Sequence, residues 1–173
     1  MKHLFLFSTI ILFAFVSCSK QYSEAHDAAL IEGRWKVESI RYVGTLNDGT
    51  EVSNEVNDCD FFWVGDIVEF KGGELFLGER GTGFYSMFSG YPGSIQYSII
   101  DHQLYIPEQV FAADPQDAGD GWTATMTTTV EECFLPYSLS EDTWIIWLKH
   151  RGWFKVEYGS FDCDFEFVLK RVK

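Results

Sequence analysis

Residues 161–171 of the 173-residue chain spell FDCDFEFVLKR, and their polarity alternates along most of this stretch. One set of alternate positions is mostly apolar: Cys163, Phe165, Phe167, Leu169 and Arg171. The intervening set is mostly charged: Asp162, Asp164, Glu166 and Lys170. Successive side chains of a β-strand point to opposite faces, so this pattern predicts a strand with one face in a core and one in water. Residues 33–43 repeat the alternation, with Trp35 and Val37 opposite Lys36 and Glu38.

The chain between these two segments is a series of short runs rich in aromatic and β-branched residues, separated by Gly, Asn, Asp and Pro. That composition is typical of an all-β protein. The expected strands are 33–43, 64–71, 74–79, 82–88, 94–100, 103–107, 123–132, 134–139, 143–149, 152–158 and 161–171. Two longer stretches, 44–62 and 108–122, are predicted to be loops.

Aromatic residues make up 17% of the chain, and large side chains are what fill the interior of a wide barrel. No long 3.6-residue periodicity and no internal repeat is present. The sequence therefore predicts an antiparallel up-and-down β-barrel, with a β-sandwich or an incomplete barrel as open alternatives.

The N-terminus carries a targeting signal. A short basic start precedes an apolar run from Leu4 to Val16, and Ser17 and Cys18 follow. This arrangement describes a secretory signal peptide, and the run is shorter than the roughly 20 apolar residues of a membrane span. Phe15-Val16-Ser17-Cys18 resembles a bacterial lipobox, in which the cysteine is lipidated and becomes the first mature residue, although Phe15 stands where Leu is usual. An ordinary signal peptide with an incidental cysteine is the alternative.

These features divide the chain into a signal peptide (1–17), a lipidated tether (18–31) with a helical turn at 25–31, and one β domain (32–173). The lipobox resemblance implies a protein of the bacterial cell envelope. We expect it to be held at the outer membrane, on the periplasmic or the surface side, by acyl chains such as palmitate on Cys18.

The chain is strongly acidic. Removing residues 1–17 takes away one basic residue and no acid, which leaves 12 Lys and Arg against 26 Asp and Glu, a net charge of −14. Such a protein repels nucleic acid and anionic lipid headgroups. We therefore expect no nucleic-acid partner and a membrane attachment that depends on acyl chains, because two or more chains give stable anchoring.

Both ends of the β domain resemble one protein family. Gly33-Arg34-Trp35-Lys36-Val37 resembles the GxW motif that opens the first strand of lipocalins, and residues 167–173, FVLKRVK, resemble the closing strand of small bacterial lipocalin-like lipoproteins. Residues 97–106 and 139–144 are similar to a hairpin and a later turn of that family. The resemblance implies a lipocalin-like barrel in which Trp35 packs against Arg171 at the closed end. The alternation independently places both residues on the inward face.

Three cysteines remain after signal removal, and thiols outside the cytoplasm tend to oxidise. Antiparallel pairing of the last strand with the first puts Cys163 near residue 43, where the 44–62 segment leaves the barrel. Cys59 lies late in that segment. This placement predicts a Cys59–Cys163 disulfide that leaves Cys133 as a thiol, with a Cys133–Cys163 pair as the competing possibility.

Motifs for catalysis or cofactor binding are absent. The histidines stand outside Ser/His/Asp and Cys/His spacings, there is no GxSxG, and no Gly-rich loop joins a strand to a helix. Asp114, Asp117 and Asp120 hint at calcium, but their spacing of three differs from that of an EF-hand loop, and a solvated acidic loop explains them. We expect a non-enzymatic protein with no cofactor and no metal.

Aromatic residues of the middle and late strands either line a ligand cavity or fill the barrel. The ligand-lining candidates are Phe84, Tyr85, Phe88, Trp144, Trp147, Phe165 and Phe167. Two functions follow. The first is a lipid-anchored envelope protein that binds a small hydrophobic ligand in its barrel. The second is a non-enzymatic interaction subunit of an envelope complex with a filled barrel. An empty apolar cavity would favour the first function, and a packed interior the second.

Overall fold

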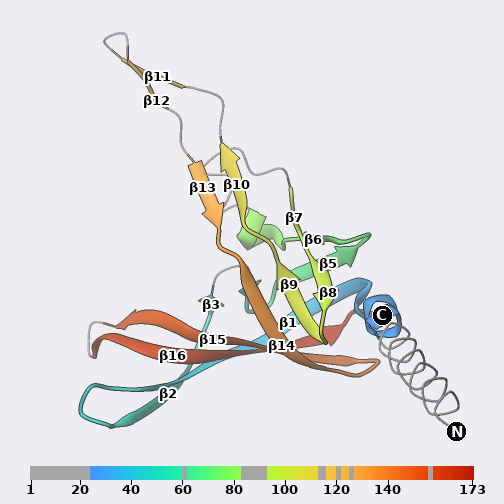
Figure 1. Ribbon diagram of the computed structural model, residues 1–173, viewed down its shortest axis with the longest axis horizontal. Helices are drawn as coiled ribbons and strands as arrows, with labels where there is room; N and C mark the ends of the chain where they lie inside the picture. The colour runs from blue at the N-terminus through green and yellow to red at the C-terminus, as the bar shows by residue number, and fades with distance from the viewer. Residues whose placement is uncertain are drawn as a thin grey trace, which may run out of the picture.

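The computed structural model describes residues 24–59, 62–82, 93–112, 116–119, 122–124, 127–155 and 158–173. Antiparallel strands dominate these residues, and most of them join one curled sheet (Figure 1). The strands are β1 (Gly33–Thr45), β2 (Glu51–Val56), β3 (Asp58–Cys59), β4 (Phe62–Trp63), β5 (Ile67–Lys71), β6 (Glu74–Phe76), β7 (Ser94–Gln96), β8 (Ser98–Ile100), β9 (Gln103–Ile106), β10 (Gln109–Ala112), β11 (Gln116–Gly119), β12 (Trp122–Ala124), β13 (Thr127–Val130), β14 (Cys133–Leu139), β15 (Thr143–Lys155) and β16 (Gly159–Arg171). The all-β prediction is confirmed.

The main sheet is a nearly closed barrel. Its strand order is β7-β6-β5-β1-β16-β15-β14-β9-β8, with β2 added beside β1. The two outermost strands, β7 and β8, are separated in sequence by Tyr97 alone. The chain thus leaves one edge of the sheet and enters the other, and the Tyr97 N–H reaches the Gly73 carbonyl at 2.9 Å. Of the predicted alternatives, the incomplete barrel describes this sheet.

The first and last strands pair antiparallel, as the sequence predicts. Trp35 lies opposite Arg171, and Gly44 lies opposite Cys163, with a bulge between Val37 and Ser39. The inward side chains of both strands are mostly buried in the core, whereas the outward ones are mostly charged and are exposed or half-buried. This alternation is what sets the register, because a slip of one residue would bring the charged face inside.

Two parts of the structure extend beyond the barrel (Figure 1). The long strands β1, β15 and β16 continue past it side by side, joined by β2, and form a flat arm. The hairpins β10–β13 and β11–β12 follow one another along a second projection. The predicted loops at 44–62 and 108–122 are therefore wrong, because both contain paired strands. β2 has the polar sequence EVSNEV and is largely exposed, so it lacks the apolar face that marks a strand in sequence.

A short helix covers one end of the barrel. Residues 24–31 are helical, which confirms the predicted turn, and the helix lies beside the C-terminus in Figure 1. Ile31 is fully buried, and its carbonyl accepts a 2.7 Å hydrogen bond from the indole nitrogen of Trp35. Within the described residues no helix is both long and apolar enough to cross a membrane. The predicted signal peptide, the lipobox and Cys18 lie outside the described residues.

The segment after β6 departs from the strand prediction. Residues 79–82 are helical, whereas the sequence pattern predicts strands over 74–79 and 82–88, the second of which lies almost wholly outside the described residues. The buried Asp66 carboxylate accepts the backbone N–H groups of Arg80 at 2.9 Å and Gly81 at 3.3 Å. A carboxylate that satisfies the first N–H groups of a turn favours a helix start over a strand.

Candidate functional site

An opening in the described structure lies where β14 separates from β15. The two strands pair only from Tyr137 opposite Ile146 to Leu139 opposite Trp144. On the other side of Tyr137, residues 133–136 pair with β9 instead, while β15 continues along β16. The space between residues 129–135 and residues 148–151 is called the wedge below. It holds a cavity of about 370 Å³.

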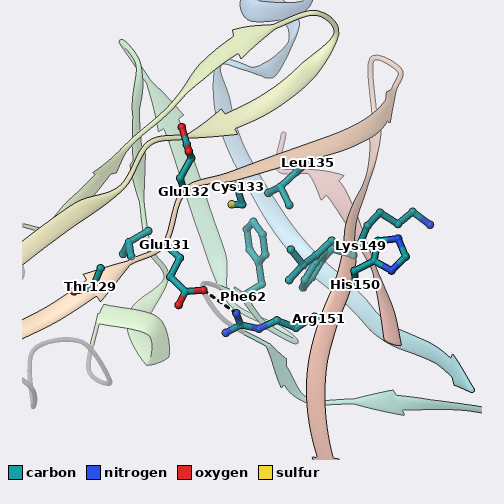
Figure 2. Close-up of a pocket in the computed structure, with 12 residues that line it drawn as sticks. Phe62, Thr129, Glu131, Glu132, Cys133, Leu135, Lys149, His150 and Arg151 are labelled. Atoms are coloured by element: carbon teal, nitrogen blue, oxygen red, sulfur yellow. Dashed lines mark hydrogen bonds and ion pairs between the residues drawn. The ribbon is translucent and has the colours of Figure 1, made fainter. Parts of the chain in front are cut away.

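The floor of the wedge is apolar. The rings of Phe62 and Phe167 form its centre, with their centroids 5.1 Å apart, and Leu135 and Leu148 lie on either side of them. Figure 2 shows the Phe62 ring between Cys133 and Leu135 on one side and Arg151 on the other. These side chains come from β4, β14, β15 and β16, so the cavity exists only because the sheet opens here.

The rim of the wedge is charged. Arg151 and Glu131 face each other from opposite sides, with Nη1 and Oε2 3.3 Å apart, drawn as a dashed line in Figure 2. Lys149 and His150 lie on the outer side of the same strand and contact carboxylates of β16. The Lys149 ammonium lies 2.7 Å from Asp164. These basic side chains are 40% to 86% exposed, so they remain accessible.

A bulge in β15 places Lys149, His150 and Arg151 at the rim of the wedge. The pairing with β16 shifts register between Leu148 and Arg151, and His150 adopts a left-handed conformation with φ of 54°. The Asp164 carboxylate accepts the His150 N–H at 3.0 Å and so holds the bulge. Hydrogen bonding from Lys149 first, and from the His150 N–H next, lowers the pKa of Asp164 below its usual value. The carboxylate therefore stays charged at neutral pH.

The predicted disulfide is wrong. Cys59, Cys133 and Cys163 are all present as thiols. Cys163 does lie opposite Gly44, as expected, but its sulfur is directed to the Arg151 carbonyl at 3.5 Å. Cys59 belongs to β3, whose partner is β4, and this small ladder replaces the flexible loop on which the disulfide prediction depended. Burial, with Asp162 and Asp164 nearby, raises the pKa of Cys163 to about 11, so this thiol is a poor nucleophile at neutral pH.

The predicted barrel-closing pair is present. The guanidinium carbon of Arg171 lies 4.2 Å from the centre of the Trp35 ring, a cation–π distance. Arg171 also donates to the carbonyls of Leu30, Glu32 and Glu141. This end of the barrel is therefore closed by one side chain that binds both the helix and a strand turn.

The predicted ligand-lining residues lie in different parts of the structure. Phe84, Tyr85 and Phe88 lie outside the described residues. Trp144 and Phe165 are fully buried in the core. Trp147 is on the outer face and donates to Glu166 at 3.1 Å, so its predicted place in a lining is wrong, because it alternates with the inward residues Ile146 and Leu148. Phe167 alone among the described candidates lines the wedge.

The described residues include no group of three or more His, Cys, Asp and Glu side chains placed to hold a metal ion. Asp114 and Asp120 of the calcium hint fall outside the described residues. Asp117 is in β11, a strand of a hairpin, where the sequence predicts a loop.

Most residues of the wedge are missed by sequence reasoning. Phe62 falls in a predicted loop, and His150 and Arg151 fall in the gap between the predicted strands 143–149 and 152–158, which are one continuous strand, β15. Two signals were available. Pro136 interrupts a strand pattern, and proline in a strand marks an edge or an irregularity. The run Lys149-His150-Arg151 breaks the alternation of β15 and marks its bulge.

Comparison of this chain with protein-family models, with curated proteins and with solved structures finds no match. The resemblance to lipocalin-like lipoproteins thus stays a prediction.

Proposed function

We propose that this protein is a non-enzymatic interaction subunit of the bacterial cell envelope, anchored by acyl chains on Cys18. In this proposal the barrel is a rigid scaffold and the wedge is the binding surface. The observation that supports it most directly is the packing of the barrel interior.

Aromatic side chains fill that interior. Trp35, Phe70 and Trp144 are fully buried, and the Trp144 ring makes edge contacts with Trp35 at 5.6 Å and Phe70 at 4.7 Å. On the arm side, Tyr42 contacts Phe165 at 6.1 Å in the same core. Edge-to-face packing of this kind belongs to a stable core and leaves little space for a ligand inside the barrel. Binding is therefore expected at the surface.

The position of the helix supports an anchored orientation. Six residue steps separate Cys18 from Glu24, where the helix begins, and even an extended chain of that length spans only roughly 20 Å. A lipid on Cys18 would hold the helix-covered end of the barrel close to the membrane. The wedge and the long projection with β10–β13 would then be available to a partner.

A small apolar ligand is the second candidate function, now placed in the wedge instead of the barrel interior. The cavity of about 370 Å³ supports it, because pockets for small molecules begin at roughly 300 Å³. The apolar floor and the charged rim suit an amphipathic molecule.

Site-specific photo-crosslinking in intact cells tests the first function. A benzophenone amino acid at Glu131, which lies at the rim of the wedge, should give a defined protein adduct, whereas the same group at Glu55 on β2 should not. Adducts of equal yield at both positions would contradict the proposal. Native mass spectrometry of the full chain in mild detergent tests the second function, since a bound small molecule would add a discrete mass.

The anchor has its own test. Cys18→Ala should release the protein from the membrane fraction or leave its signal peptide uncleaved, whereas Cys133→Ala should leave fractionation unchanged. If Cys18→Ala stays in the membrane fraction as a processed protein, the acyl anchor is wrong.

A further inference from the structure

Three neighbouring strands, β8, β9 and β14, present an outer face of unusual composition. Alternation along each strand turns Ile99, Leu104 and Leu135 towards the core, and the three lie in register with one another. No outward side chain of these three described strands is charged. Two rows of outward residues across the strands are called the uncharged face below: Ser98, Tyr105 and Phe134, and Ile100, Gln103 and Pro136.

Large apolar side chains of the uncharged face meet solvent. Ile100 is 39% exposed and Phe134 is 49% exposed. The Tyr105 ring lies against that of Phe134 with the centroids 4.6 Å apart, and its hydroxyl donates to Glu132 at 2.7 Å. An aromatic ring in an apolar patch, with its polar tip directed to the margin, suits the interface between a membrane and water.

The outer faces of β1 and β16 are different. In β16 the outward residues include Asp162, Asp164 and Glu166, and in β1 they include Lys36 and Arg41. Without residues 1–17 the chain has a net charge of −14, so most of its surface is repelled by anionic headgroups. The uncharged face is a surface that can approach a bilayer without bringing carboxylates against it.

The helix that follows the proposed anchor lies beside one end of the uncharged face. The Glu24 carboxylate accepts the Asp101 N–H at 3.2 Å, and Asp27 lies 3.3 Å from a ring nitrogen of His102. Asp101 and His102 form the turn that joins β8 to β9, and Figure 1 shows the helix next to this turn. The start of the helix is therefore adjacent to the row that contains Ile100.

The length of chain before the helix limits where the lipid can be. Cys18 lies six residues before Glu24, so it is at most roughly 20 Å from the start of the helix. The more distant row of the uncharged face contains Tyr105, three residues beyond His102, which a strand covers in about 10 Å. A bilayer that holds an acylated Cys18 can therefore reach the whole face.

The closed end of the barrel is a poorer surface for the bilayer. The Asp142 carbonyl accepts the Arg171 N–H there, and the exposed Asp142 carboxylate pairs with Lys173 at 3.9 Å. Contact with lipid at this end would remove water from charged groups, which is costly. The uncharged face avoids that cost, so the barrel is expected to lie on its side and not to stand on its end.

We infer that the uncharged face rests on the lipid surface, with Ile100 and Phe134 in the interfacial region of the bilayer. This inference rests on the proposed acyl anchor and adds an orientation that the anchor alone leaves open. The acyl chains supply the affinity for the membrane. The uncharged face determines which side of the barrel lies against it.

Photo-crosslinking to lipid tests this orientation. The full acylated chain, with a benzophenone amino acid at Phe134, is reconstituted into vesicles of phosphatidylethanolamine and phosphatidylglycerol. Irradiation should give a lipid adduct that mass spectrometry detects, whereas the same group at Lys36 should give little. Lys36 is the matched position because its side chain is also 49% exposed and it adjoins Trp35, which contacts the helix, but it lies on the charged outer face of β1.

Charge variants give a second readout. With the benzophenone at Gln103, in the other row of the face, Phe134→Glu should lower the yield of lipid adduct about fivefold, because an anionic surface repels a carboxylate held against it. Lys36→Gln lowers the net charge by the same single unit and should leave the yield unchanged. A thermal melt of each variant verifies folding. Equal reductions by the two variants would show a general charge effect and overturn the inference.

The anchor and the orientation fail in distinguishable ways. An acylated chain with equal lipid adducts from positions 134 and 36, or with none from 134, overturns the orientation and leaves the anchor in place. A purified chain whose mass includes no acyl group overturns both. In intact cells, an adduct from position 134 to another protein or to a second copy of this chain would identify a different occupant and overturn the inference. Crosslinking from Glu131 decides the interaction function separately.

Discussion

The closed end of the barrel and the wedge are both places where strands lose their neighbours, but the side chains that bridge them differ in burial and in number of contacts. At the closed end, the Arg171 guanidinium binds three backbone carbonyls and covers the Trp35 ring. At the wedge, Glu131 and Arg151 form an exposed ion pair across the gap. The closing contact is thus made by several groups at once, whereas the Glu131 and Arg151 side chains that meet across the wedge are 79% and 40% exposed.

The helix strengthens the closed end. Asp27 accepts a 2.8 Å hydrogen bond from the Tyr137 hydroxyl and lies 3.3 Å from the His102 ring nitrogen. Glu24 accepts the Asp101 N–H at 3.2 Å. The helix thus joins β14 to the turn between β8 and β9. The contrast between these helix contacts and the exposed pair at the wedge indicates that stability is concentrated at the closed end. The side chains of the wedge can therefore change their contacts without loss of the fold.

The largest expected effect is at Trp35. Trp35→Ala should lower the free energy of unfolding by about 3–5 kcal/mol, because it empties the volume of a fully buried indole. Urea denaturation followed by circular dichroism measures it. Trp147→Ala removes the same side chain from the outer face and should cost much less. If both substitutions lower the free energy of unfolding equally, the contrast between the packed interior and the outer face of the barrel is wrong.

Arg171 comes next. Arg171→Lys keeps the charge but loses the planar fork that reaches three carbonyls, and should cost about 2–3 kcal/mol. Arg41→Lys is the matched control, because the Arg41 guanidinium reaches an exposed carboxylate of Glu166 at 3.2 Å and such pairs contribute at most about 1 kcal/mol. A loss no larger than that of the control would show that Arg171 does not close the barrel energetically.

Leu148 tests the wedge side. Leu148→Ala should cost only about 1 kcal/mol, because the side chain is partly buried and borders an open cavity. Leu104→Ala, at a fully buried position of β9, should cost about 2–5 kcal/mol. If the two substitutions destabilise equally, the wedge is part of the structural core and not an adaptable surface.

The smallest effect concerns pH. The pKa of Asp164 is lowered in the folded state, so its contribution to stability is present above the unfolded value of about 3.9 and is lost as pH falls through the folded pKa. Lys149→Met removes the main cause and should make the melting temperature fall less steeply below about pH 4. Lys170→Met is the control, since the Lys170 ammonium donates to the Thr143 hydroxyl and, among the described residues, forms no ion pair with a carboxylate. If the melting temperature of Lys149→Met falls as steeply at acid pH as that of the unsubstituted protein, Asp164 is not the cause of the fall.

Local pattern was sufficient for the barrel but not for the openings in it. The alternation of 161–171 places Arg171 on the inward face, as that of 33–43 does for Trp35, and the resemblance to lipocalins implies their contact, which is present. It fails for Trp147, where a large aromatic side chain suggested a lining but the parity of β15 puts it outside. It fails also for β2, which pairs with β1 although its sequence is largely polar and most of its side chains are exposed.

By itself the sequence determined the all-β class and the inward faces of the first and last strands, which carry Trp35 and Arg171, because each depends on alternation along a single strand. Only the tertiary structure decided that β14 leaves β15 at Tyr137, that Cys59 is held in its own small ladder instead of a disulfide, and that Phe62 and Phe167 meet beneath the wedge. These features depend on which strands are neighbours. Neighbour relations are set by the closure of the whole sheet, which no local segment encodes.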